Sequence, residues 1–118
     1  MKTLFLDDDK ERHRRFTMNR IGQDITQVWN CDEACAALAA TRYAVAYLDH
    51  DLSDMAAAGM PARGEKTGTD VAEFIAAMPP EARPETVVIH SFNDYGRRRM
   101  ASILREAGVR CVIEPFKG

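Results

Sequence analysis

The sequence predicts one α/β domain built around a doubly wound, five-stranded parallel sheet. Short apolar runs alternate with helix-like segments along nearly the whole chain, in the order βαβαβαβαβ. Three of the apolar runs end in acidic or histidine side chains, beginning at Asp7, Asp49 and His90. Strands that are connected through helices lie parallel, so their carboxyl ends share one edge of the sheet. We therefore expect the functional crevice at that edge.

The first half of the chain contains three predicted strands and two predicted helices. Asp9 precedes a basic stretch with a thin apolar stripe and is interpreted as the N-cap of a helix. Asn30 followed by Glu33 is the capping pattern that opens an alanine-rich helix. The predicted strands are 3–7, 26–29 and 43–48, and the predicted helices are 10–20 and 30–40.

The second half resumes the alternation after residues 52–66, a long segment without clear periodicity that we expect to be a mobile insert. Thr67 and Asp70 cap a helix with apolar residues at helical spacing, and two prolines at 79–80 end it. Gly108 is expected to end the last helix in the left-handed conformation. The predicted helices are 67–78 and 94–107, and the predicted strands are 86–89 and 110–113.

The composition is that of one soluble domain. With 118 residues, 46% of them hydrophobic and 29% charged, the chain can bury a single core. No apolar run approaches the roughly 20 residues of a membrane helix and no signal-peptide pattern is present, so we expect a cytoplasmic protein with no membrane partner. The net charge of -2 gives no overall case for nucleic-acid binding. The cysteines at 31, 35 and 111 have no metal or redox spacing and are interpreted as reduced, structural thiols.

Five positions at the predicted strand ends carry a family resemblance. Asp7 and Asp8 form an acidic pair after the first strand, Asp49 closes the third, Ser91 closes the fourth, and Pro115 follows the fifth. This set resembles the receiver domain of response regulators over nearly the whole chain. The resemblance implies a flavodoxin-like sheet with the strand order 2-1-3-4-5, and it places Asp49 at the phospho-accepting position.

One matched position departs from that family, and three further motifs extend the resemblance. Receivers normally carry a lysine immediately before the proline, where its ammonium contacts the phosphoryl group, and here the residue is Glu114. The chain also contains L-D-H-D at 48–51, T-G-x-D at 67–70 and H-S-x-N at 90–93. With these motifs the sequence resembles the divergent receiver-like family that is predicted to process cyclic phosphates.

The acidic residues predict a divalent metal site on grounds of charge alone. Carboxylates gathered in one crevice repel each other, so either some are protonated or a cation holds them together. Asp7, Asp8, Asp49 and Asp51 offer the hard oxygen ligands that Mg²⁺ or Mn²⁺ prefers. For Asp51, a structural role is an equally good interpretation.

Two of the three histidines lie at the predicted carboxyl ends of central strands. His50 and His90 would suit the acid and base roles of cyclic phosphodiester hydrolysis, because imidazole titrates near neutral pH. The alternative is a buried histidine that braces a loop. His50 is the weaker candidate, because alternation along a strand could turn it away from Asp49 and Asp51. His13, in the basic helix, is interpreted as a solvated surface residue.

Four further residues are candidates for binding phosphate. Ser91 and Asn93 could direct a hydroxyl and an amide toward phosphate oxygens, although Asn93 also suits an N-cap. Thr67 has the same two interpretations. Arg97 stands near the start of a helix, where an anion could bind, although a solvated face is the simpler interpretation.

These observations predict a metal-dependent phosphoesterase, with Asp49, His90 and His50 in its catalytic site, that hydrolyses a cyclic phosphate in a nucleotide, at an RNA end or in a related small molecule. The main alternative is a signalling receiver that is phosphorylated on Asp49 and binds a partner protein. Two others are a degenerate interaction domain and a haloacid-dehalogenase-type phosphatase using Asp7 and Asp9. The last is the least favoured, because the chain is short and offers no evident site lysine.

Overall fold

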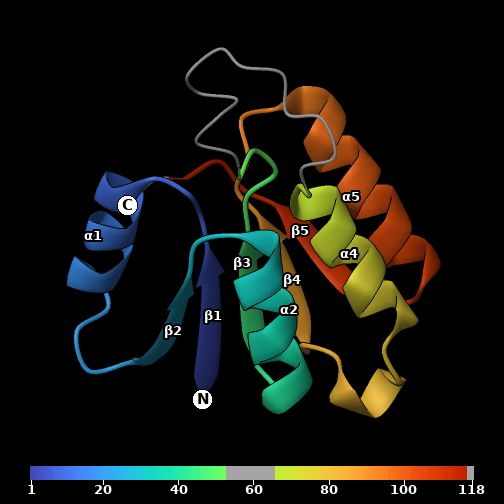
Figure 1. The fold of residues 1–118 in the computed structure, drawn as a ribbon, viewed down its shortest axis with the longest axis horizontal. Coiled ribbons are helices and arrows are strands. Elements are labelled where there is room, and N and C mark those ends of the chain that lie inside the picture. Colours follow the sequence, from blue (N-terminus) through green and yellow to red (C-terminus); the bar gives the residue numbers. More distant parts are fainter. Residues whose placement is uncertain (53–65, 117–118) are drawn as a thin grey trace.

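The computed structural model describes residues 1–52 and 66–116 (Figure 1). Five parallel strands form one sheet in the order β2-β1-β3-β4-β5, which confirms the predicted fold class and strand order. The predicted insert at 52–66 lies outside the described residues except for its two ends. The strands are β1 (Lys2–Leu6), β2 (Asp24–Val28), β3 (Val45–Leu48), β4 (Thr86–Ile89) and β5 (Arg110–Ile113).

The helices connect consecutive strands and lie on opposite sides of the sheet. Figure 1 shows α2, α4 and α5 together on one side, with α1 apart from them. This division follows from right-handed crossovers, because the chain moves one way from β1 to β2 and the other way in each step from β2 to β3, β4 and β5. None of the helices described is long and apolar enough to cross a membrane. The helices are α1 (Lys10–Met18), α2 (Cys31–Ala40), α4 (Gly68–Ala77), α5 (Asp94–Glu106) and a 3₁₀ turn, η1 (Pro80–Ala82).

Alternate strand residues pack against the two helical layers. Leu4, Leu6 and Leu48 belong to a buried aliphatic core that also includes residues of α2, α4 and α5. Phe5 stacks on Phe16 of α1 at a centroid distance of 4.1 Å, so aromatic packing dominates beneath α1. Both patterns follow from the two-residue period of a strand.

The helix starts agree with the predicted caps, whereas two strands begin two residues away from their predicted starts. Asp9, Asn30 and Asn93 accept hydrogen bonds from backbone N–H groups at the helix starts, and Gly108 adopts a φ of 85° after α5. Strand β2 begins two residues before the prediction, because its pairing with β1 begins at Asp24, and β3 begins only at Val45. Pairing with a neighbouring strand sets these limits, and local composition does not reveal it.

Gly68 fixes the entry to α4 against the end of β3. Its N–H donates to the carbonyl of His50 at 2.9 Å, and an added Cβ would lie 2.1 Å from the carbonyl oxygen of Asp49. The Thr67 side chain and the carboxylate of Asp70 complete the capping box of α4. The T-G-x-D motif therefore holds the backbone beside Asp49 in place.

We predict that Gly68→Ala destabilises the fold by more than about 2 kcal/mol, because the clash is with backbone that cannot move aside. Urea unfolding followed by circular dichroism would measure the loss. Ser102→Ala, at an exposed position of α5, is the matched control and should change the free energy of unfolding by less than about 0.5 kcal/mol. Equal stability of the two variants would contradict the close approach described for Gly68.

Candidate functional site

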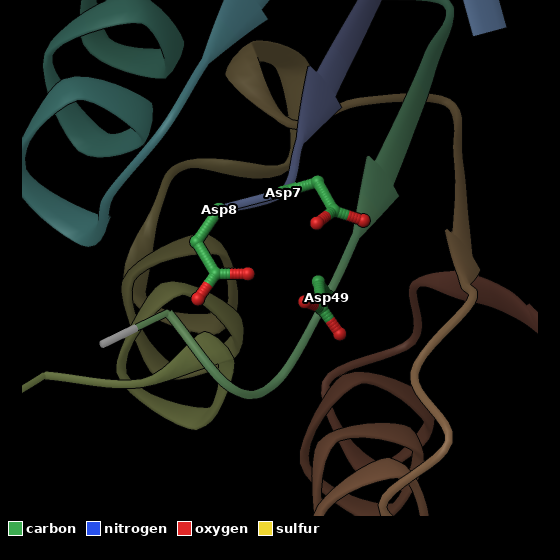
Figure 2. Close-up of side chains that lie close together, drawn as sticks. All are labelled: Asp7, Asp8 and Asp49. Carbon is green, nitrogen blue, oxygen red and sulfur yellow. The ribbon is translucent and has the colours of Figure 1, made fainter. Parts of the chain in front are cut away.

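Three carboxylates converge at the carboxyl ends of the neighbouring strands β1 and β3 (Figure 2). One oxygen from each of Asp7, Asp8 and Asp49 lies within 4.8 Å of the others. Asp7 and Asp49 are buried, with exposed fractions of 0% and 3%, whereas Asp8 is half-buried. The predicted edge of the sheet therefore gathers three of the four predicted acids, in an arrangement that a divalent cation can bind.

Burial and mutual repulsion alter the acidity of Asp49. Desolvation, followed by the charge of Asp7, raises the pKa of Asp49 from 3.8 to about 7. The guanidinium of Arg12 and the N–H of His50 act in the opposite direction but do not cancel the effect. Without a cation, the cluster therefore holds a proton up to near-neutral pH.

Asp7 is held in place by His90 and by backbone. The Nε2 atom of His90 lies 2.8 Å from Asp7 Oδ2, and the N–H of Asp9 donates to Asp7 Oδ1 at 2.8 Å. The His90 ring is 2% exposed and stacks on Phe5 at 5.1 Å, and its Nδ1 has no hydrogen-bond partner among the described residues. The enclosed His90 ring holds Asp7 in position, as in the interpretation of His90 as a buried, bracing histidine. Its burial also leaves the His90 ring little access to a substrate.

His13 is buried, so its interpretation as a solvated residue is wrong. Its ring is 2% exposed, with Nε2 at 2.8 Å from the carbonyl oxygen of Asp7 and Nδ1 at 3.0 Å from Gln27 Oε1. Trp29 stacks on it at 3.6 Å. The spacing of three residues to Phe16 places both side chains on the face of α1 that packs on the sheet, and this spacing was the available signal.

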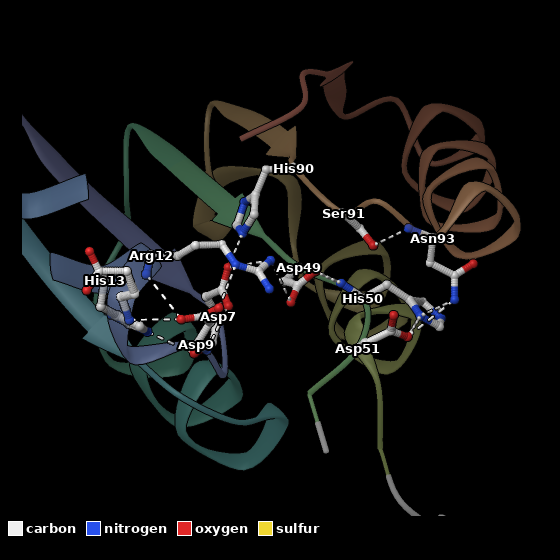
Figure 3. Close-up of polar contacts among 11 residues, drawn as sticks. Asp7, Asp9, Arg12, His13, Asp49, His50, Asp51, His90, Ser91 and Asn93 are labelled. Carbon is white, nitrogen blue, oxygen red and sulfur yellow. Dashed lines mark hydrogen bonds and ion pairs between the residues drawn. The ribbon is translucent and has the colours of Figure 1, made fainter. Parts of the chain in front are cut away.

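Arg12 is a site residue that sequence reasoning placed only within a basic helix. Its Nη1 atom lies 3.4 Å from Asp7 Oδ2 and 3.9 Å from Asp49 Oδ2, while its Nε donates to Asp9 Oδ2 at 3.3 Å (Figure 3). The side chain is 26% exposed. Its position three residues after the N-cap was the available signal, because the first turn of α1 faces the strand ends. Glu114 supplies no such cation, and its side chain is exposed.

A second polar cluster lies beside Asp49. His50 Nδ1 is 2.8 Å from Asp51 Oδ1, and Asn93 Nδ2 donates to the same oxygen at 3.2 Å (Figure 3). Alternation along the strand therefore does not turn the His50 ring away from Asp51. Asp51 lies outside the group of three acids that could share a metal. The His50 ring fits against α5 because residue 96 is glycine, where an added Cβ would lie 2.4 Å from His50 Cγ.

The remaining candidates for phosphate binding have structural partners. Ser91 is buried and its Oγ accepts from the N–H of Asn93 at 3.1 Å, while Asn93 also caps α5. Thr67 caps α4. Arg97 pairs with Asp94 at 2.9 Å, one turn along an exposed helix face. The structure thus brings the aspartates together and gives these four residues local roles, without excluding a ligand.

Comparison of the sequence with models of protein families identifies the family of this chain. The family model described as "Cyclic-phosphate processing Receiver domain" matches residues 2–106. The chain belongs to this receiver-domain family. No curated protein sequence matches the chain.

Solved structures similar to this receiver domain show the same fold. A receiver domain of a response regulator from Methylobacillus flagellatus has 17% identity and a TM-score of 0.68, covering 99% of this chain and 88% of that chain. A two-component response regulator from Clostridium difficile has 19% identity and a TM-score of 0.68, with coverage of 99% and 85%. A response regulator from Burkholderia pseudomallei has 18% identity and a TM-score of 0.63, with coverage of 98% and 61%. At such identities the likeness shows the fold alone.

The pKa of Asp49 predicts a dependence of stability on pH and on metal. Because its pKa of about 7 in the folded state exceeds its ordinary value of 3.8, the folded state keeps the proton between these values. Metal-free protein should therefore lose stability, relative to Asp49→Asn, as the pH rises from about 4 to 7. A bound divalent cation should offset that loss, so Mg²⁺ should raise the melting temperature more at pH 8 than at pH 5.

Thermal melts with Mg²⁺ or with a chelator, across this pH range, would measure both effects. Asp8→Asn should reduce the response to metal, whereas Asp24→Asn, at the opposite end of the sheet, should leave it unchanged. A response that is the same in wild type and Asp8→Asn would contradict a metal site at the cluster.

Proposed function

We propose that this domain is a phosphoryl-accepting receiver in which Asp49 takes the phosphoryl group and the three-acid cluster binds Mg²⁺ or Mn²⁺. The observation that carries the proposal is the position of Asp49, buried at the end of β3 and within 4.8 Å of Asp7 and Asp8. The similar Burkholderia pseudomallei structure is described as having a phosphorylated aspartic acid and a calcium ion, which supports this assignment.

The proposed reaction is a transfer from an acyl phosphate or a phosphoramidate. An oxygen of ionised Asp49 attacks the phosphorus, forming an O–P bond, while the bond from phosphorus to the donor breaks and the donor's leaving atom keeps the electron pair. The divalent cation, when bound, supplies positive charge against the phosphoryl oxygens and favours the ionised form of Asp49. As a signalling module, the phosphorylated domain would bind a partner protein with changed affinity.

Of the two carboxylate oxygens of Asp49, Oδ2 is the better nucleophile. Oδ1 accepts a hydrogen bond from the N–H of His50 at 2.9 Å, which withdraws electron density from it. Among the described residues, the polar contact of Oδ2 is the long one with Arg12, at 3.9 Å. We therefore assign phosphoryl transfer to Oδ2.

Incubation with acetyl phosphate and Mg²⁺, followed by intact-mass spectrometry, tests this proposal. Wild type should gain the mass of one phosphoryl group, and the adduct should be labile in base, as acyl phosphates are. Asp49→Asn should gain none, because it lacks the nucleophile, while the control Asp24→Asn should behave as wild type. An adduct that persists in Asp49→Asn would refute the assignment of Asp49.

Hydrolysis of a cyclic phosphate is a second candidate function, favoured by the His50–Asp51 pair and by the description of the family. If His50 donates through Nδ1 to Asp51, its Nε2 carries a lone pair that can accept a proton from an attacking water. The pair lies next to the metal cluster, because His50 directly follows Asp49. A nucleotide, an RNA end or a related small molecule would be the substrate.

For this candidate we expect turnover of 2′,3′- or 3′,5′-cyclic nucleotides, or of RNA ending in a cyclic phosphate, with Mg²⁺ or Mn²⁺, measured by ³¹P NMR. His50→Ala should lower the rate at least about 100-fold, which is the usual contribution of a general base. Asp51→Asn should lower it less, because the ring stays but loses its orienting charge. Turnover that survives His50→Ala, or none in wild type with metal, would exclude this mechanism.

A further inference from the structure

We propose that Arg12 is the cation that binds the phosphoryl group on Asp49. The inference deepens the proposed receiver function and rests on it. A divalent cation neutralises only part of the charge of two remaining carboxylates and a phosphoryl group. A second cation at the site is therefore needed, and arginine is always charged and matches phosphate oxygens with its planar set of N–H groups.

The position of Arg12 suits this role. Its Nη1 lies beside both Asp7 Oδ2 and Asp49 Oδ2, at 3.4 Å and 3.9 Å. Because Asp49 Oδ1 is occupied by the backbone N–H of His50, Oδ2 is the oxygen left to carry phosphorus, and it is the oxygen that faces Arg12. A phosphoryl group there would bring its own oxygens toward the guanidinium.

The guanidinium is anchored but not saturated. Its Nε is fixed by Asp9, which is itself the N-cap of α1, so the side chain is held toward the strand ends. Both contacts of Nη1 are longer than a normal charge-assisted hydrogen bond, and Nη2 has no partner among the residues described. These N–H groups can therefore form shorter bonds to an incoming anion.

Two other basic side chains, Lys66 and Arg97, pair with acids outside the three-acid cluster. Lys66 pairs with Asp32 at 3.0 Å, and Arg97 pairs with Asp94 at 2.9 Å. Within residues 1–52 and 66–116, Arg12 is the arginine or lysine that forms ion pairs with Asp7 and Asp49. The opposing explanation is that Arg12 only holds the acids in position, in which case its loss would weaken Mg²⁺ binding as well as beryllofluoride binding.

Binding of beryllofluoride separates these explanations, because this anion occupies a carboxylate oxygen with the shape of a phosphoryl group. Calorimetry would measure beryllofluoride affinity in the presence of Mg²⁺, and Mg²⁺ affinity alone, for wild type, Arg12→Gln, Arg12→Lys and the control Arg14→Gln. Arg14 is an exposed residue of the same helix that pairs with Glu11. We expect Arg12→Gln to bind beryllofluoride at least about tenfold more weakly than wild type, with Mg²⁺ affinity unchanged or higher.

Arg12→Lys should be intermediate, because it keeps the charge and loses the planar set of donors, and Arg14→Gln should match wild type. Equal beryllofluoride affinity in Arg12→Gln and wild type would overturn the inference and leave the receiver function standing. A parallel loss of Mg²⁺ affinity would overturn it in favour of a role in holding the acids in position. If wild type binds Mg²⁺ but no beryllofluoride, the receiver function fails, and this inference with it. If Arg12→Gln does not fold, the test is made with Arg12→Lys instead. A beryllofluoride affinity of Arg12→Lys equal to that of wild type would then overturn the inference.

Discussion

The burial of carboxylates at the carboxyl edge of the sheet is the constraint on which the rest of the site depends. Asp7 is fully buried and Asp49 nearly so, although they lie on adjacent strands and repel each other. Burying like charges together is unfavourable unless donors or cations surround them. Each polar group near this edge is therefore best understood by what it does for these two acids, and the raised pKa of Asp49 shows that the compensation is incomplete.

The compensation comes from three elements that are far apart in the sequence. His90, at the end of β4, and His13, in α1, contact the side chain and the backbone of Asp7 respectively, and Arg12 reaches both acids from the same helix. On the other side, Gly68 brings α4 against the backbone of Asp49. The result is a preorganised cluster with one oxygen of Asp49 held by backbone and the other directed toward a cation. Such an arrangement suits a ligand that carries negative charge and arrives with a metal ion.

Sequence patterns predicted the fold and the convergence of the acids, because both depend on strand periodicity and on the parallel connection rule. The helix caps were also predictable, since each depends on residues within one turn. His13 and Arg12 were missed, because the thin apolar stripe of α1 gives only a weak indication of which helix face packs on the sheet. The spacing of His13 to Phe16 and the position of Arg12 after the N-cap were the only local signals. The pairing of His90 with Asp7 joins residues that are 83 positions apart, which no local pattern encodes. The strand limits likewise followed from pairing rather than from composition.

The two proposed functions would both use the cluster of acids with a divalent cation, and they differ in which group would attack phosphorus. A receiver uses Asp49 itself, whereas hydrolysis uses water and needs a base. In the second proposal His50 would be that base, and its ring lies against Gly96, where an added Cβ would come within 2.4 Å of His50 Cγ. Gly96 is the third residue of α5, so it lets the start of this helix lie close against the His50–Asp51 pair. Hydrolysis of a cyclic ester would require that oriented ring, whereas transfer of a phosphoryl group to Asp49 would not. The effect of His50→Ala on each reaction therefore distinguishes the two proposals.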